Sequence, residues 1–230
     1  NGKYIAQNGR VFGSEVYSDL EATLAAVLLD ESIHGDPADI APNTGKVREP
    51  VLRFVHWARA FDVDNVDSDE VTDLNDSSDP AGRLGQHPLK ARSVFNFYRP
   101  GYVAPNTESG TLGLTTPELQ TSNESSAMGY TNFMTQFVFN DIKPRYAKEG
   151  TPLFTPDYEG AASLADTPNQ MLDRLDLILT ANRLTETERN EIEDIITLIP
   201  LSGDEEEARL TRVKVAVFLI INTATYGLVQ

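Results

Sequence analysis

The chain has 230 residues, no cysteine and a formal net charge of −16, from 35 acidic and 19 basic side chains. The lack of cysteine excludes disulfides, zinc–thiolate sites and thiol nucleophiles. The acidic excess argues against a nucleic-acid partner, because it would repel phosphate. The longest apolar run, residues 215–221, is too short to span a bilayer. With 40% hydrophobic residues, we expect an acidic globular protein that buries a sizeable core.

The N-terminal quarter predicts two helices after an irregular start over residues 1–17. Ser18 and Glu21 have the spacing of a capping box and predict the beginning of the first helix. We expect this helix to bury one apolar face, formed by Leu20, Leu24, Val27 and Leu28. The second helix is expected from about Glu49, because Pro50 is well tolerated in a first helical turn. Its other side is basic, with Arg48, Arg53, His56 and Arg59.

Residues 62–80 form an acidic segment, which we predict to be an exposed loop inserted in a single domain spanning residues 1–230. Carboxylates in a loop also suit Ca²⁺, and the candidate ligands are Asp64, Asp67, Asp69 and Asp73. The spacing departs from an EF-hand, since Glu70 stands where that loop needs glycine. A solvated acidic loop is therefore the favoured interpretation, calcium is the alternative, and no other cofactor is predicted.

Four more helices are expected after residue 120, so the predicted fold is an all-α, irregular multi-helix domain with long loops. The first covers 123–140, with Met128, Phe133, Met134, Phe137 and Val138 packed inward. After a connection over 143–167, the others begin at Thr167-Pro168, at the capping box of Thr185 with Glu188, and at that of Ser202 with Glu205. No strand pair with a hairpin turn and no internal repeat is recognised.

The most distinctive stretch runs from His87 to Asn132, and four of the eight residues from Phe95 to Tyr102 are aromatic. Helical spacing would place Ala91, Val94, Phe95 and Tyr98 on one face, which predicts core packing for Phe95. Stacking of Phe95, Phe97, Tyr98 and Tyr102 on sugar rings is the alternative. The candidate residues for a polar site or a buried network are His87, Lys90, Arg92, Asn96, Arg99, Glu118, Gln120, Glu124 and Asn132.

The carboxylates of this stretch allow two interpretations. Glu118 and Glu124 could act as an acid/base pair, or they could form buried ion pairs with Arg92 or Arg99 that fix two segments together, which we favour. Zinc-site histidine spacing, phosphate-binding glycine loops and a nucleophile elbow are all missing from the sequence. The residues therefore predict no particular catalytic chemistry.

Several stretches, in this order along the chain, resemble the bacterial family known as domain of unknown function 1800. They are 45–53, His87-Pro88-Leu89-Lys90, 93–102, Pro117-Glu118-Leu119-Gln120, 123–125, 129–133 and 213–230. The resemblance covers nearly the whole chain and implies the C-terminal part of a longer, exported bacterial protein. It implies a periplasmic or extracellular location and possible packing against an N-terminal part of the same protein. The family is often encoded beside one that resembles sulfatases, and it brings no established activity.

Two functions follow as expectations. The first is a structural or interaction module of an exported bacterial protein, with a protein or an extracellular polymer as partner. The alternative is a hydrolase or binding protein that acts on an extracellular polysaccharide, with His87, Lys90, Arg99, Glu118 and Glu124 lining a pocket.

Overall fold

The computed structural model describes residues 2–30, 46–63, 77–140, 155–201 and 204–229. They are mainly helical, which confirms the all-α prediction. The chain divides into two compact units, one of residues 1–46 with 229–230 and one of residues 47–228. The single-domain organisation stays a prediction. The acidic residues at 64–76 lie outside the described residues.

The smaller unit begins with a hairpin, where the sequence analysis expected irregular chain and no strand pair. Strand β1 (Tyr4–Ile5) pairs antiparallel with β2 (Val11–Phe12), with Tyr4 opposite Phe12. The turn is closed by hydrogen bonds between Ala6 and both Gly9 and Arg10. Gly9 has φ +78°, which a residue without Cβ adopts at little cost. The strands were missed because two residues each are too short to show alternation.

Helix α1 (Leu20–Leu28) follows the hairpin and is capped by Asp19, not by Ser18. The Asp19 carboxylate accepts a hydrogen bond from Ala22 N, whereas Ser18 has φ +68° and cannot take the cap position. The predicted inward face is also wrong. Ala22 and Ala25 are the buried residues, and exposed fractions run from 59% to 75% for Leu20, Leu24, Val27 and Leu28.

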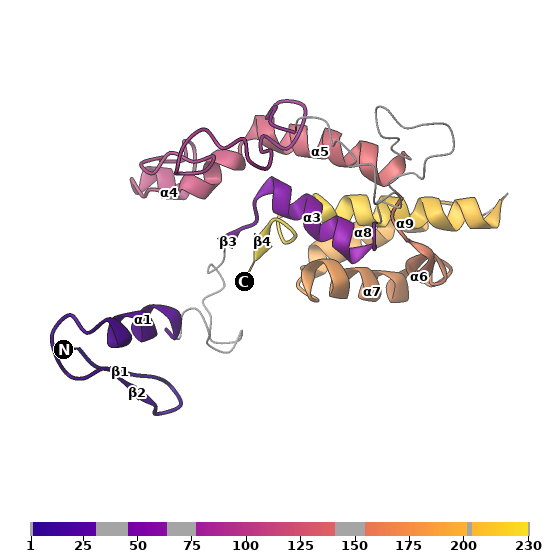
Figure 1. Ribbon diagram of the computed structural model, residues 1–230. Coiled ribbons are helices and arrows are strands. Elements are labelled where there is room, and N and C mark those ends of the chain that lie inside the picture. The colour runs from indigo at the N-terminus through magenta and orange to yellow at the C-terminus, as the bar shows by residue number, and fades with distance from the viewer. Residues whose placement is uncertain (1, 31–45, 64–76, 141–154, 202–203, 230) are drawn as a thin grey trace, which may run out of the picture. The chain divides into compact units, whose positions relative to one another are not determined.

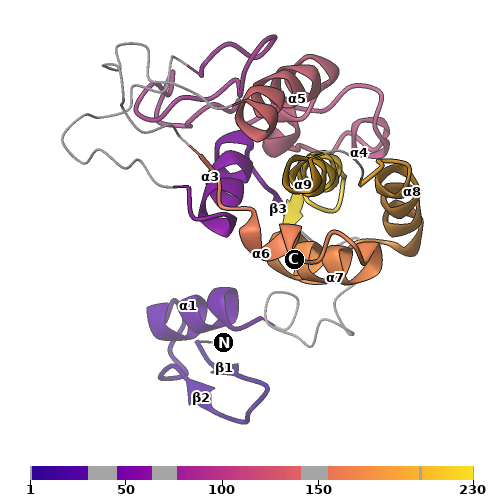
Figure 2. The ribbon, with the colours of Figure 1, turned by 90° about the vertical axis from the view of Figure 1, so that its right-hand side faces the viewer.

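The larger unit is built around one long helix, α9 (Glu205–Ile221), which packs against α5, α6, α7 and α8 (Figures 1 and 2). The other elements are α3 (Pro50–Ala60), α4 (Glu108–Thr111), the 3₁₀ helix η1 (Pro117–Thr121), α5 (Glu124–Phe139), α6 (Glu159–Ala162), α7 (Pro168–Thr180) and α8 (Glu186–Thr197). Strand β3 (Lys46–Val47) pairs with β4 (Leu228–Val229). Among the described residues, none of the helices has the length and hydrophobicity needed to cross a bilayer.

The core of this unit joins α3 to α5 through aromatic contacts and surrounds α9 with aliphatic ones. The Phe54 ring lies edge-on to Phe137, with centroids 4.9 Å apart, and Trp57 is fully buried. Met128, expected to pack inward, is 67% exposed, because it lies on the far side of α5 from the buried positions Phe133, Met134, Phe137 and Val138. The fully buried aliphatic residues of α9 are Val213, Ala216, Val217, Ile220 and Ile221.

Most helix starts lie where the sequence predicted them. Pro50 occupies the first turn of α3, α5 begins after Asn123, and α8 has the full capping box of Thr185 with Glu188. The start of α9 differs. Asp204 caps that helix by accepting hydrogen bonds from the backbone of Glu206 and Glu207, and Ser202 lies outside the described residues.

Candidate functional site

The central motif, residues 87–102, is a chain of tight turns rather than the helix that the aromatic spacing predicted. Backbone hydrogen bonds close turns at 87–90, 93–96, 95–98 and 99–102. The Ser93 hydroxyl accepts from Phe95 N, and such local bonds compete with helix formation. Asn96 has φ +60°, which an α-helix excludes. Phe95 is consequently 58% exposed, so its predicted core role is wrong.

The motif is held to the beginning of α3 by a buried amide just before it. Gln86 is fully buried, its Oε1 accepts from Val51 N at 3.1 Å, and its Nε2 donates to the Glu49 carboxylate at 3.1 Å. Its carbonyl accepts from the Ser77 hydroxyl at 2.6 Å. His87 follows, with its Nδ1 accepting from Ser77 N at 3.2 Å. His87 is therefore placed to hold the turn.

Tyr98 is the aromatic residue of the motif whose hydroxyl lies near Glu49 and Gln86. It is half-buried, and burial, followed by the negative charge of Glu49, raises the pKa of its hydroxyl. Nothing in the sequence marked Glu49 or Gln86 as functional residues. The first backbone N–H groups of a helix have no partner within the helix, so a buried helix start needs an acceptor from elsewhere. The helix start predicted at Pro50 is the signal that could have pointed to such an acceptor.

The nine predicted site residues do not form a buried network. His87 and Gln120 are half-buried, and the others, Lys90, Arg92, Asn96, Arg99, Glu118, Glu124 and Asn132, are exposed. Arg99 N donates to Gln120 Oε1 at 2.9 Å, which joins the motif to η1. The favoured buried ion pairs of Glu118 and Glu124 with arginine do not form among the described residues, because both carboxylates remain in solvent.

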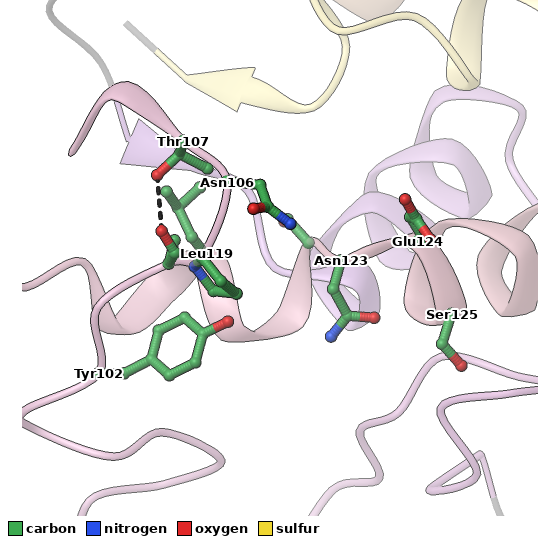
Figure 3. A pocket seen from close by; sticks show the side chains of 10 residues that line it. Tyr102, Asn106, Thr107, Leu119, Asn123, Glu124 and Ser125 are labelled. Carbon is green, nitrogen blue, oxygen red and sulfur yellow. Dashed lines mark hydrogen bonds between the residues drawn. The ribbon is translucent and has the colours of Figure 1, made fainter. Parts of the chain in front are cut away.

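A pocket of 540 Å³ lies between the end of this motif and the start of α5 (Figure 3). Its lining residues are Tyr102, Ala104, Pro105, Asn106, Thr107, Leu119, Ser122, Asn123, Glu124 and Ser125. Thr116 N donates to Tyr102 O at 2.8 Å, and this hydrogen bond joins the end of the motif to the segment before η1. Thr107 caps α4, and its hydroxyl donates to Ala104 O at 2.8 Å. Of the nine predicted residues, Glu124 is the one that lines this pocket.

The polar groups of the pocket divide into those already bonded and those open to a ligand. The Asn123 amide is bonded at both ends, accepting from Ser126 N and donating to Gln120 O. The side chains of Tyr102, Asn106 and Glu124 make no hydrogen bond to any described residue. Figure 3 shows Glu124 and Ser125 at the start of α5, with their oxygen atoms pointing in different directions, and Tyr102 on the opposite side of the view. The pocket therefore offers an aromatic face, an amide, hydroxyls and one carboxylate.

No metal centre is visible in the part of the chain that the structure describes, where no three metal-ligating side chains gather. The predicted calcium ligands Asp64, Asp67, Asp69 and Asp73 lie outside the described residues. Calcium binding thus stays a prediction.

These observations define the class of the protein as a mainly helical one, with a turn-rich polar motif beside an open pocket. The family model for proteins of unknown function DUF1800 matches residues 1–228. The chain belongs to this family, as the resemblance of its motifs predicted. No curated protein and no solved structure matches the chain significantly.

Proposed function

We propose that the chain is an interaction module of an exported bacterial protein and that its 540 Å³ pocket binds an uncharged, hydroxyl-rich ligand of the polysaccharide class. The observation that supports this proposal is the set of open groups in the pocket: the Tyr102 phenol, the Asn106 amide and the Glu124 carboxylate. The location, periplasmic or extracellular, follows from the resemblance to exported proteins.

The chemistry of the lining residues favours a neutral glycan. A phenol ring can pack against the C–H face of a sugar, while amide and carboxylate groups bond its hydroxyls. No lysine, arginine or histidine is among the lining residues, so the pocket offers an anionic polymer no cationic partner. The volume falls within the roughly 300–1,000 Å³ that is usual for ligand pockets.

The same lining favours binding over hydrolysis. Most glycoside hydrolases use two carboxylates, about 5–10 Å apart, on either side of the bond that breaks. Glu124 is the one carboxylate among the lining residues, and Glu118 does not belong to them. The hydrolase remains the second candidate function because Glu124 is exposed and open to a substrate.

Affinity electrophoresis in gels containing soluble neutral polysaccharides, such as a β-glucan, a xylan and a mannan, tests the binding function. We expect at least one polymer to retard the wild-type chain, and Tyr102→Ala or Asn106→Ala to remove most of the retardation. Tyr17→Ala is the matched control, because Tyr17 is 87% exposed and lies in the smaller unit. The proposal fails if no polymer retards the wild type, or if the pocket variants are retarded as strongly as it is.

A reducing-end assay on the retarding polymer separates the two candidate functions. The binding function predicts no release of reducing ends. Release that is lost in Glu124→Gln would instead establish the hydrolase. Fractionation of cells that produce the full-length protein tests the proposed location.

A further inference from the structure

Two arginine side chains lie together at the beginning of α3, in the larger unit and away from the pocket lining. Arg48 precedes the helix and Arg53 lies one turn inside it, and both are half-buried. Arg53 Nε donates to Arg48 O at 2.8 Å, which holds the two residues side by side. Arg48 N donates to Gly227 O at 2.8 Å, so the C-terminal turn forms a further side of the cluster.

Two buried tyrosines form the walls behind these cations. The Arg48 guanidinium lies 4.9 Å from the centroid of the Tyr226 ring, and that of Arg53 lies 5.5 Å from the Tyr130 ring. Tyr226 is fully buried and its hydroxyl donates to Arg53 O at 2.7 Å. The His56 ring packs edge-on against Tyr226, and its Nε2 lies 3.2 Å from Ile178 O.

Hydrogen-bonding groups in this cluster are left open. Arg48 Nη1 is completely buried, and no hydrogen-bond partner for it exists among the described residues. The same holds for the hydroxyl of Tyr130, a residue that is only 3% exposed. Buried polar groups are nearly always hydrogen-bonded, so two open ones in one place call for a partner.

The charges of the cluster are also uncompensated. No described carboxylate lies within 4.0 Å of either guanidinium, although the chain has 35 acidic residues. Glu49, between the two arginines in sequence, instead accepts from Gln86 Nε2. Burial lowers the pKa of Arg53, and the positive charge of Arg48 lowers it further. Two neighbouring cations withdrawn from water strongly favour an anion beside them.

We propose that Arg48, Arg53 and Tyr130 form a binding site for a single small oxyanion group, a carboxylate or a phosphate. The planar guanidinium fork matches the two oxygens of such a group, and the Tyr130 hydroxyl supplies a third donor. The N-terminal end of α3 adds partial positive charge, and its first turn holds no acidic side chain. The net charge of −16 restricts the ligand to one small group rather than a long polyanion.

Thermal unfolding of the chain with added sodium phosphate, sodium sulfate or sodium acetate tests the site, with sodium chloride of equal ionic strength as reference. A ligand that binds only the folded state raises the melting temperature in proportion to its saturation. We expect phosphate and sulfate, or acetate, to raise it above the chloride value. The anion that acts identifies a tetrahedral oxyanion or a carboxylate as the ligand group.

Arg48→Met and Tyr130→Phe locate the effect. We expect each to weaken the anion-dependent shift, with binding measured by calorimetric titration falling about tenfold for a lost charge-assisted hydrogen bond. Tyr130→Phe keeps the aromatic wall and removes only an unbonded hydroxyl, so it should fold as well as the wild type without anion. Arg10→Met is the matched control, because Arg10 also stacks on a ring, that of Phe12 at 5.0 Å, in the smaller unit.

The proposal is overturned if chloride stabilises the wild type as much as the oxyanions do. It is equally overturned if Tyr130→Phe and Arg48→Met keep the full anion-dependent shift. Loss of that shift in Arg10→Met, but not in Tyr130→Phe, would move the site to the smaller unit. Because the readout is anion binding, these results do not depend on the polysaccharide assay.

Discussion

The indole nitrogen of Trp57 donates a hydrogen bond to the hydroxyl of Tyr158, 3.2 Å away, in the interior of the larger unit. Both side chains are at most 2% exposed, and the bond joins α3 to the residue that precedes α6. Tyr158→Phe removes the acceptor but keeps the ring, so we expect a loss of about 1–3 kcal/mol in the free energy of unfolding, measured in urea. Tyr17→Phe, at a residue 87% exposed, should leave that free energy unchanged.

Arg212 supports the packing of three helices through backbone carbonyls rather than through an ion pair. It is 7% exposed, its Nη1 donates to Ala165 O at 2.8 Å after α6, and its Nη2 donates to Ile199 O after α8. Arg212→Met would leave both carbonyls without a donor, and we expect the free energy of unfolding to fall by about 2–4 kcal/mol.

Arg209→Met is the control for this change, one turn earlier on the same helix. Arg209 pairs with Asp166 at 2.7 Å, but the two side chains are 37% and 54% exposed. Exposed ion pairs contribute about 0–1 kcal/mol. Equal losses in the two variants would show that the two carbonyl hydrogen bonds of Arg212 stabilise the fold no more than an exposed ion pair does.

What the sequence could predict was local. The start of α8 depends on Thr185 and Glu188, and that of α3 on Pro50, so neighbours within four residues were sufficient. The turns at 93–98 show the limit of this approach. There the apolar spacing of Phe95 and Tyr98 imitated a helix, while the Ser93 side chain bonded its own backbone and favoured a turn.

The candidate sites show the same division. Tyr102 and Glu124 lie in the distinctive stretch from His87 to Asn132 that the sequence marked out, and both line the pocket. The arginine cluster could not be predicted, because it depends on contacts such as that between Arg53 and Tyr226, which are 173 positions apart. The helical periodicity of residues 50–60 predicted that Arg53 lies on the polar side of its helix. In the structure, the turn around Tyr226 covers Arg53.

The carboxylate of Glu188 makes the stability of the larger unit depend on pH. Burial raises its pKa, but hydrogen bonds from Thr185 and Thr225 outweigh burial, so the pKa lies below the ordinary value of 4.5. A carboxyl with a lowered pKa in the folded state stabilises the protein fully above pH 4.5, and this contribution is lost as the pH falls through the folded value. We expect Glu188→Gln to lower the free energy of unfolding by about 1 kcal/mol at neutral pH and by much less near pH 3.

Urea unfolding at pH 7 and pH 3 measures this difference. Glu186→Gln, in the first turn of the same helix, is the control that keeps the capping box. If Glu188→Gln lowered the free energy of unfolding equally at both pH values, the stabilisation would not depend on the ionised Glu188 carboxylate.

Gly129 fixes the distance between α5 and the turn over residues 80–83. A Cβ at Gly129 would lie 2.5 Å from Pro80 O and 2.6 Å from Arg83 O, both of them backbone atoms that cannot rotate away. Gly129→Ala gains helix propensity of about 1 kcal/mol, but the clash requires the turn to move. Overpacking of this kind costs about 1–3 kcal/mol or more, so we expect a net loss in the free energy of unfolding and a shifted turn over residues 80–83.

Gly101→Ala is the matched control, since nothing lies within 4 Å of its added carbon, and its unfolding midpoint should equal that of the wild type. Urea unfolding followed by circular dichroism compares the two, and a Gly129→Ala midpoint at or above that of Gly101→Ala would show that α5 and the turn do not pack this closely.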